Sequence, residues 1–100
     1  MFKDVIKLIA YTSGTNDRGN VIKTPVSRQV YAQKTSVRQS EFYQAAAQGL
    51  RAERMYIVRS ADYNEETALQ AGERVYKIIR AYDKDGEFTE LVCQGMVSGG

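Results

Sequence analysis

Histidine is absent from this 100-residue sequence, and with it the commonest general base and the commonest metal ligand in proteins. Nucleophilic catalysis needs a base beside the nucleophile, so this absence argues against the usual hydrolase arrangements. The acidic turn at residues 83–87 superficially suggests a calcium loop, but it lacks the ligand run and the closing glutamate at the required spacing. We therefore expect no enzymatic activity, no cofactor and no metal site.

Cysteine and long apolar runs are also scarce. Cys93 is the single cysteine, so it cannot form an internal disulfide, and we expect it to be a small buried residue. No apolar stretch reaches the roughly 18 residues of a transmembrane helix. Charged residues interrupt residues 1–12, which makes them a poor signal peptide. These features predict synthesis in a reducing cytoplasm and no membrane partner.

The net charge of +2 is small, but the charges are unevenly distributed. Residues 1–60 contain ten Lys/Arg and four Asp/Glu, whereas residues 61–100 contain four and eight. Such a polarised chain could turn a basic face toward a polyanion, or its two halves toward each other in neighbouring copies. Complementary charges within one sheet are the third interpretation. Seven tyrosines in so short a chain favour an interface.

Strand-forming residues dominate the chain. The predicted strands cover residues 4–12, 21–35, 51–60, 74–83 and 88–97, with a short sixth strand near 67–69 left open. The Asp-Gly pair at 85–86 predicts the last hairpin. A sheet of this size avoids exposed edges by closing, so the fold class is mainly β: one domain over residues 1–100, a small antiparallel β-barrel of five or six strands. The predicted core comprises Ile6, Leu8, Ala10, Phe42, Ile57, Ile78 and Leu91.

The first two strands form a long hairpin around a polar turn at residues 13–20. Its outer part, about residues 12–28, has few apolar residues, so we expect an arm that projects beyond the core. Pro25 removes a ladder donor and marks an edge, a bulge or a bend. We expect the arm to be mobile alone and ordered on assembly. The candidate arm residues are Asn16, Asp17, Arg18, Asn20, Lys23 and Arg28.

One short helix is predicted within residues 36–50, between the second and third strands. Ser36 and Gln39 have the spacing of a capping box, and Gly49 suits a left-handed stop. We expect an apolar side to lie on the barrel and a polar side to point away. The apolar side comprises Phe42, Ala45, Ala46 and Gly49, and the polar side comprises Arg38, Gln44 and Gln48.

Basic and aromatic residues alternate in two of the predicted strands, which could indicate nucleic-acid binding through base stacking. Cross-strand packing of the aromatic rings is the favoured explanation. The residues are Lys23, Arg28, Tyr31 and Lys34 in one strand, and Arg54, Tyr56 and Arg59 in the other.

The order of parts carries a family resemblance. A hairpin with the tip "TNDRGNVIKT" precedes "SVRQSEFYQAAAQGL", and a strand ending near Tyr63 and then "VYKIIRAY" (75–82) follow. In this order and spacing the chain, from about Val5 to Val97, resembles the head closure proteins of tailed bacteriophages, also called head–tail joining or head–tail adaptor proteins.

The resemblance implies a non-enzymatic β-barrel protein that forms a ring, usually dodecameric, below the portal and its adaptor in the virion. Such a ring continues the DNA channel, helps retain packaged DNA and presents the surface to which the tail attaches. In some relatives the segment between strands two and three guards the channel. By this resemblance the DNA-channel candidates here are Arg38, Gln44, Gln48 and Arg51.

Three alternatives remain at this point. The protein could be a tail terminator or tail-completion protein, or a free nucleic-acid-binding barrel. Arg38 and Arg51 could instead pair with neighbouring acids such as Glu41 or Glu53.

Overall fold

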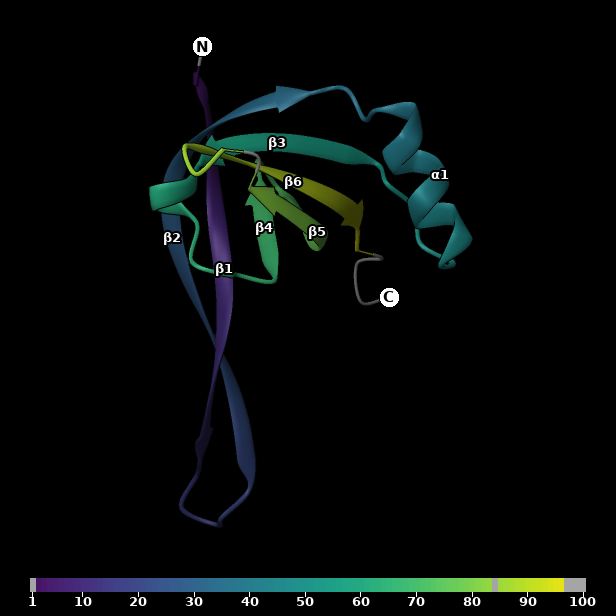
Figure 1. Cartoon of the computed structure of the whole chain (residues 1–100). Helices are drawn as coiled ribbons and strands as arrows, with labels where there is room; N and C mark the ends of the chain where they lie inside the picture. Colours follow the sequence, from purple (N-terminus) through teal and green to yellow (C-terminus); the bar gives the residue numbers. More distant parts are fainter. Residues whose placement is uncertain (1, 84, 97–100) are drawn as a thin grey trace.

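Six antiparallel strands close into a barrel in the order β1-β2-β3-β6-β5-β4 (Figure 1). The computed structural model describes residues 2–83 and 85–96. The predicted mainly β fold, with one α-helix between the second and third strands, is confirmed. None of the helices in the described residues is long and apolar enough to cross a membrane. The elements are β1 (Asp4–Thr15), β2 (Val21–Thr35), α1 (Gln39–Ala47), β3 (Arg54–Arg59), the 3₁₀ helix η1 (Ser60–Asp62), β4 (Ala68–Ala71), β5 (Arg74–Asp83) and β6 (Phe88–Gly95).

The short sixth strand is present and closes the barrel. It is β4, which pairs with β5 on one side and with residues Lys7–Ile9 of β1 on the other. Ala68 and Leu69 are both buried there, so this short segment contributes to the core as well as to the ladder. The last predicted strand is β6, and its expected final residue, Val97, lies outside the described residues.

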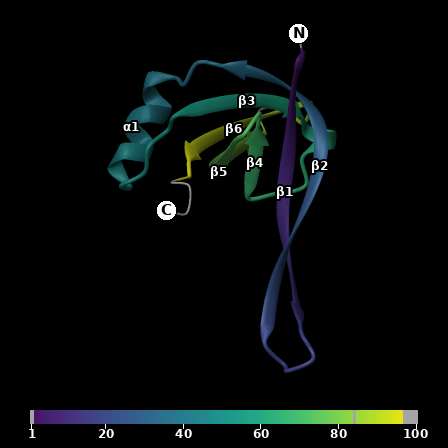
Figure 2. The ribbon, with the colours of Figure 1, turned by 180° about the vertical axis from the view of Figure 1, so that it is seen from behind.

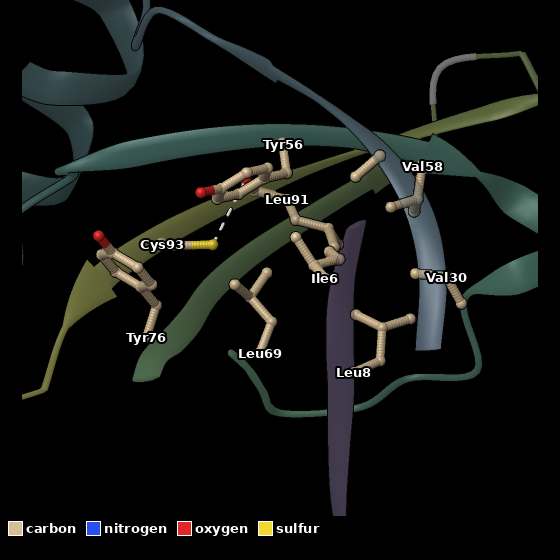
Figure 3. Packing of buried hydrophobic residues seen from close by; sticks show 10 residues of the cluster. Ile6, Leu8, Val30, Tyr56, Val58, Leu69, Tyr76, Leu91 and Cys93 are labelled. Atoms are coloured by element: carbon tan, nitrogen blue, oxygen red, sulfur yellow. Dashed lines mark hydrogen bonds between the residues drawn. The ribbon is translucent and has the colours of Figure 1, made fainter. Parts of the chain in front are cut away.

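The barrel interior is filled by one apolar cluster drawn from all six strands (Figure 3). Cys93 is fully buried within it, as predicted, and burial raises the pKa of its thiol to about 12. The rings of Tyr56 and Tyr76 lie at one end of the cluster, and Leu8 and Val30 lie at the other. The cluster comprises Ile6, Leu8, Val30, Ala32, Tyr56, Val58, Leu69, Tyr76, Leu91 and Cys93.

The predicted core is correct in part. Ile6, Leu8 and Leu91 are fully buried. The prediction for β3 chose the wrong face, because Tyr56 and Val58 fill the interior. A simple alternation could not decide this, since Met55 on the opposite face is also buried, beneath α1. Of the other predicted core residues, Ala10, Ile57 and Ile78 are half-buried. Phe42 is 50% exposed, so its assignment to the core was wrong.

The hairpin of β1 and β2 projects far beyond the barrel, as predicted (Figures 1 and 2). Its ladder continues to the pair Thr15↔Val21, whereas β3 pairs with β2 only at Gln33–Thr35. Among the residues that the structure describes, no third strand pairs with the outer part, which is therefore a two-stranded ribbon. Pro25 faces Tyr11 with no register shift, so it occupies an edge position and not a bulge.

Candidate functional site

Helix α1 lies against the outside of the barrel on a small apolar cluster. Ala45 of the helix packs there with Ala52, Met55 and Val92. The backbone N–H of Gly49 donates to the carbonyl of Ala46 at 3.0 Å, and Gly49 has a φ of +76°, so the predicted glycine stop is confirmed.

The start of α1 and its buried face differ from the prediction. The helix begins at Gln39, with Arg38 as its N-cap residue and no side-chain cap, so the predicted capping box at Ser36 is wrong. Glu41 and Ala45 face the barrel. Phe42 and Ala46, which were predicted to face it, are exposed. The Glu41 carboxylate can face the barrel because Arg80 donates a hydrogen bond to it and the guanidinium of Arg38 lies 3.6 Å away.

Four charged groups connect α1 to β5 and β6. Arg38 donates two hydrogen bonds to the Glu90 carboxylate, at 2.9 and 2.5 Å, and lies 3.6 Å from Glu41. The hydrogen bonds to Glu90 raise the pKa of Arg38 against the opposing effect of burial. Arg80 donates to Glu41 and, at 3.1 Å, to Oε1 of Gln44. Arg38 thus forms ion pairs with two acids. Glu41 was expected as a partner from the sequence, whereas Glu90 was not.

A bulge in β5 explains why this network of charged groups could not be predicted from the sequence. The register shifts between Ile78 and Arg80, which leaves Ile79 as an extra residue. Ile78 packs against the barrel core, while Ile79 packs against the cluster beneath α1. Arg80 is thereby placed beside Glu41, and no sequence pattern marks this bulge.

The remaining channel candidates lie at the other end of α1. Gln48 is exposed, and Arg51 follows it on the connection to β3. The backbone N–H of Arg51 donates to Gln94 at 2.7 Å, but its guanidinium forms no ion pair within the part of the chain that the structure describes. Glu53, the expected partner, instead accepts the N–H of Gly95 at 2.7 Å. Of the two arginines predicted to line the channel, Arg51 is therefore the one without a carboxylate partner among the described residues.

A cleft of about 330 Å³ lies between α1 and the adjoining parts of β5 and β6. Gln44 and Gln48 line it on the helix side, together with the paired charges of Glu41 and Arg80. The apolar lining comprises Ala45, Leu50, Ile79 and Val92. Among residues 2–83 and 85–96 no group of His, Cys, Asp or Glu side chains could hold a metal ion.

The arm tip is shaped by Asn16. Its side-chain oxygen accepts the backbone N–H groups of Arg18 and Asn20, each at 2.9 Å, and Gly19 supplies the positive φ of +80°. Asp17 and Arg18 are exposed at the end of the turn. Of the predicted arm residues, Asn16, Asp17, Arg18 and Asn20 therefore lie together, and Lys23 follows on the ribbon.

Arg28 belongs to the root of the arm. Its guanidinium donates to the buried Glu66 carboxylate at 2.6 Å and to the carbonyl of Asp62. Burial alone would raise the pKa of Glu66, but the hydrogen bonds from Arg28 and from the N–H of Asn64 outweigh it and lower that pKa. This pair joins β2 to the segment between β3 and β4. Glu66 was not predicted as a partner of Arg28, because two adjacent glutamates in a polar segment resemble solvent-exposed residues.

The aromatic residues interleaved with basic ones take different positions. Tyr56 is buried in the core, which confirms packing for that ring. Tyr31 is 63% exposed on β2. The guanidinium groups of Arg54 and Arg74 lie 5.6 and 5.4 Å from the ring centre of Tyr76.

Comparison with known proteins gives one finding that bears on function. The family model described as phage head completion protein matches residues 1–95, which is almost the whole chain. No curated protein matches the sequence.

Proposed function

This chain belongs to the family of phage head completion proteins, and we propose that it closes the filled head as a ring below the portal and adaptor. As a member of that family it is a structural component of the virion head and acts together with other head and tail proteins. In our proposal the ring continues the DNA channel, helps retain the packaged DNA and presents the surface for tail attachment.

The projecting ribbon of β1 and β2 is the observation that carries this proposal. A two-stranded ribbon is marginally stable by itself in water, so this one gains from packing against another protein. Its exposed side chains include Tyr11, Val21, Ile22 and Val26, which are apolar enough to be buried on assembly. The Arg28–Glu66 pair holds its root to the barrel. We propose that the arm docks on the adaptor or portal.

Purified protein added to filled heads that lack it tests the proposal. Cosedimentation with the heads, together with a rise in nuclease-protected DNA, is the expected result. Binding to tail tubes in place of heads would contradict it and favour a tail-completion protein. A micromolar, salt-dependent affinity of the isolated protein for DNA, without head binding, would favour a nucleic-acid-binding barrel.

We further propose that Arg51 faces the DNA in the channel. Arg51 is exposed, and its contacts with phosphates would carry no base information, which suits DNA that must move past. Arg38, by contrast, is occupied by Glu90 and Glu41. Arg51→Glu should leave head binding unchanged and reduce DNA retention. Lys77→Glu, the same charge change at an exposed position on β5, is the matched control and should change neither.

A further inference from the structure

The outer edge of β1 loses its neighbouring strand before β1 itself ends (Figures 1 and 2). β4 pairs with Lys7–Ile9 of β1, and no strand among the residues that the structure describes pairs with residues 11–15 at this edge. The chain turns away from β1 just before β4, where Glu65 takes a left-handed φ of +61°. The carbonyl of Glu66 accepts the hydroxyl of Tyr63 at 2.9 Å and does not extend the ladder. We call the outward side of residues 11–15 the open edge of β1.

The hydrogen bonds of the hairpin show which backbone groups point to the open edge. The N–H of Asn16 donates to the carbonyl of Asn20 at 3.0 Å, and these two residues continue the register of the β1–β2 ladder. Because hydrogen-bonded pairs alternate along an antiparallel ladder, the even-numbered residues of β1 direct their N–H and C=O groups at β2. Tyr11, Ser13 and Thr15 therefore direct theirs away from β2, to the open edge.

The other edge of the ribbon, on β2, is protected. By the same alternation the odd-numbered residues of β2 point outward, and Pro25 is one of them, so this position has no N–H to offer a partner. Arg28 holds Glu66, and with it the segment between β3 and β4, beside the inner part of β2. Proteins protect free strand edges with proline, charge or a covering segment. Residues 11–15 of β1 contain neither proline nor a charged residue, so the open edge lacks these two protections.

A hollow of about 630 Å³ lies at the open edge, where the arm meets the barrel. Tyr11 is 48% exposed and Met96 is 42% exposed there, so apolar surface is available for burial. The two charged residues of the lining, Lys23 and Glu65, have opposite signs, which makes the hollow a poor site for DNA phosphates. The rest of the lining comprises Ala10, Ser13 and Thr67. The hollow thus offers room for an uncharged segment in line with β4.

We propose that an extended, uncharged segment of the neighbouring head protein adds as a strand to the open edge of β1, end to end with β4. Main-chain hydrogen bonds to Tyr11, Ser13 and Thr15 hold the segment, and its apolar side chains cover Tyr11 and Met96. An edge of this length pairs with about five residues of a partner. This inference rests on the proposed docking of the arm on the adaptor or portal, and it specifies how the arm binds.

A second copy of this chain is a poorer occupant. Its β2 edge is interrupted by Pro25, so the edge that it could offer is the same open edge of β1. Pairing of two identical edges is symmetric and gives an isolated dimer, which does not continue into a ring. The occupant is therefore a different protein of the head.

The first test makes the same substitution on the two edges of the ribbon. Ser13→Pro removes an outward N–H from the open edge, and Ser27→Pro removes one from the β2 edge. Both variants should keep the wild-type circular dichroism spectrum and unfolding temperature, because Pro25 occupies an equivalent outward position with no register shift. Ser13→Pro should weaken cosedimentation with filled heads that lack this protein by about tenfold or more, since it removes a hydrogen bond and obstructs the edge. Ser27→Pro should bind as the wild type does.

The second test needs no variant. Hydrogen exchange of the wild-type protein, resolved to single amides, is measured in the free protein and on the same heads. Exchange slows when an amide becomes hydrogen-bonded, so the Ser13 amide should exchange at least about tenfold more slowly on heads. The Ser27 amide should exchange at the same rate in both states.

Equal head binding by the two proline variants would overturn the inference, and so would an unchanged exchange rate of the Ser13 amide on heads. Slow exchange of that amide in concentrated free protein would show pairing between copies and would also overturn it. The proposed function fails separately, if the wild-type protein does not bind filled heads at all.

Discussion

The guanidinium of Arg28 lies 2.6 Å from the carboxylate of Glu66, and this contact joins the root of the projecting arm to the segment between β3 and β4. Glu66 is buried, and the hydroxyl of Tyr63 donates to its backbone carbonyl at 2.9 Å. The arm therefore leaves the barrel from a fixed point. A docking arm needs such a root, because a defined direction reduces the entropy lost on assembly.

Arg28→Ala should lower the free energy of unfolding by about 1–3 kcal/mol, since it leaves a buried carboxylate without its cationic partner. Urea denaturation of the isolated protein measures this value. Lys23→Ala, which removes a cation farther out on the same strand, is the control and should have an effect below about 0.5 kcal/mol. Equal effects at the two positions would show that the pair does not stabilise the fold.

The same pair predicts a pH dependence. The pKa of Glu66 is lower in the folded protein than in the unfolded chain, so the folded state binds fewer protons between these two values. The stabilisation is therefore present above the ordinary glutamate pKa and is lost as the pH falls through the lower, folded value. Glu66→Gln should flatten this part of the stability profile measured by urea denaturation, whereas Glu65→Gln should leave it steep.

Leu8→Ala should cost about 2–5 kcal/mol of stability, because Leu8 is fully buried in the barrel core. Thermal or urea unfolding gives the value. Val5→Ala on the same strand changes a side chain that is 47% exposed and should cost far less. Similar losses at both positions would contradict the assigned faces of β1.

Deletion of residues 15–19 should leave the barrel folded and abolish binding to filled heads, because the deletion removes most of the arm tip and spares the core. Circular dichroism reports the fold and cosedimentation reports the binding. Tyr31→Ala, outside the tip, should retain both properties. Loss of the fold on deletion would mean that the ribbon stabilises the barrel and is not a separate docking element.

The thiol of Cys93 should resist modification in the native protein. Burial raises its pKa to about 12, so very little reactive thiolate is present at neutral pH. Labelling by a thiol reagent should accordingly follow unfolding in urea. Rapid labelling without denaturant would show that the interior opens readily.

The fold could be predicted from sequence because its signals are local. Alternating strands, the Asp85-Gly86 turn and the polar tip around Asn16 each act within a few residues. The arrangement around α1 could not be predicted in this way. The burial of Glu41 depends on Arg80, which is 39 positions away and is placed by a bulge. The exposure of Phe42 follows from that choice of face, so an apolar pattern alone favoured the wrong side.

The root of the arm was hidden for a similar reason. Arg28 and Glu66 are 38 positions apart, and neither has a local pattern that distinguishes it from a solvent-exposed charge. Contacts of this kind become visible only when the topology brings the segments together.

A cryo-electron microscopy map of filled heads with this protein bound tests whether the protein closes the head as a ring. The map should show a ring of barrels at the portal vertex, with the β1–β2 arms buried against the neighbouring head protein and Arg51 facing the DNA. Density on the tail tube alone, or arms exposed to solvent in an assembled ring, would contradict it.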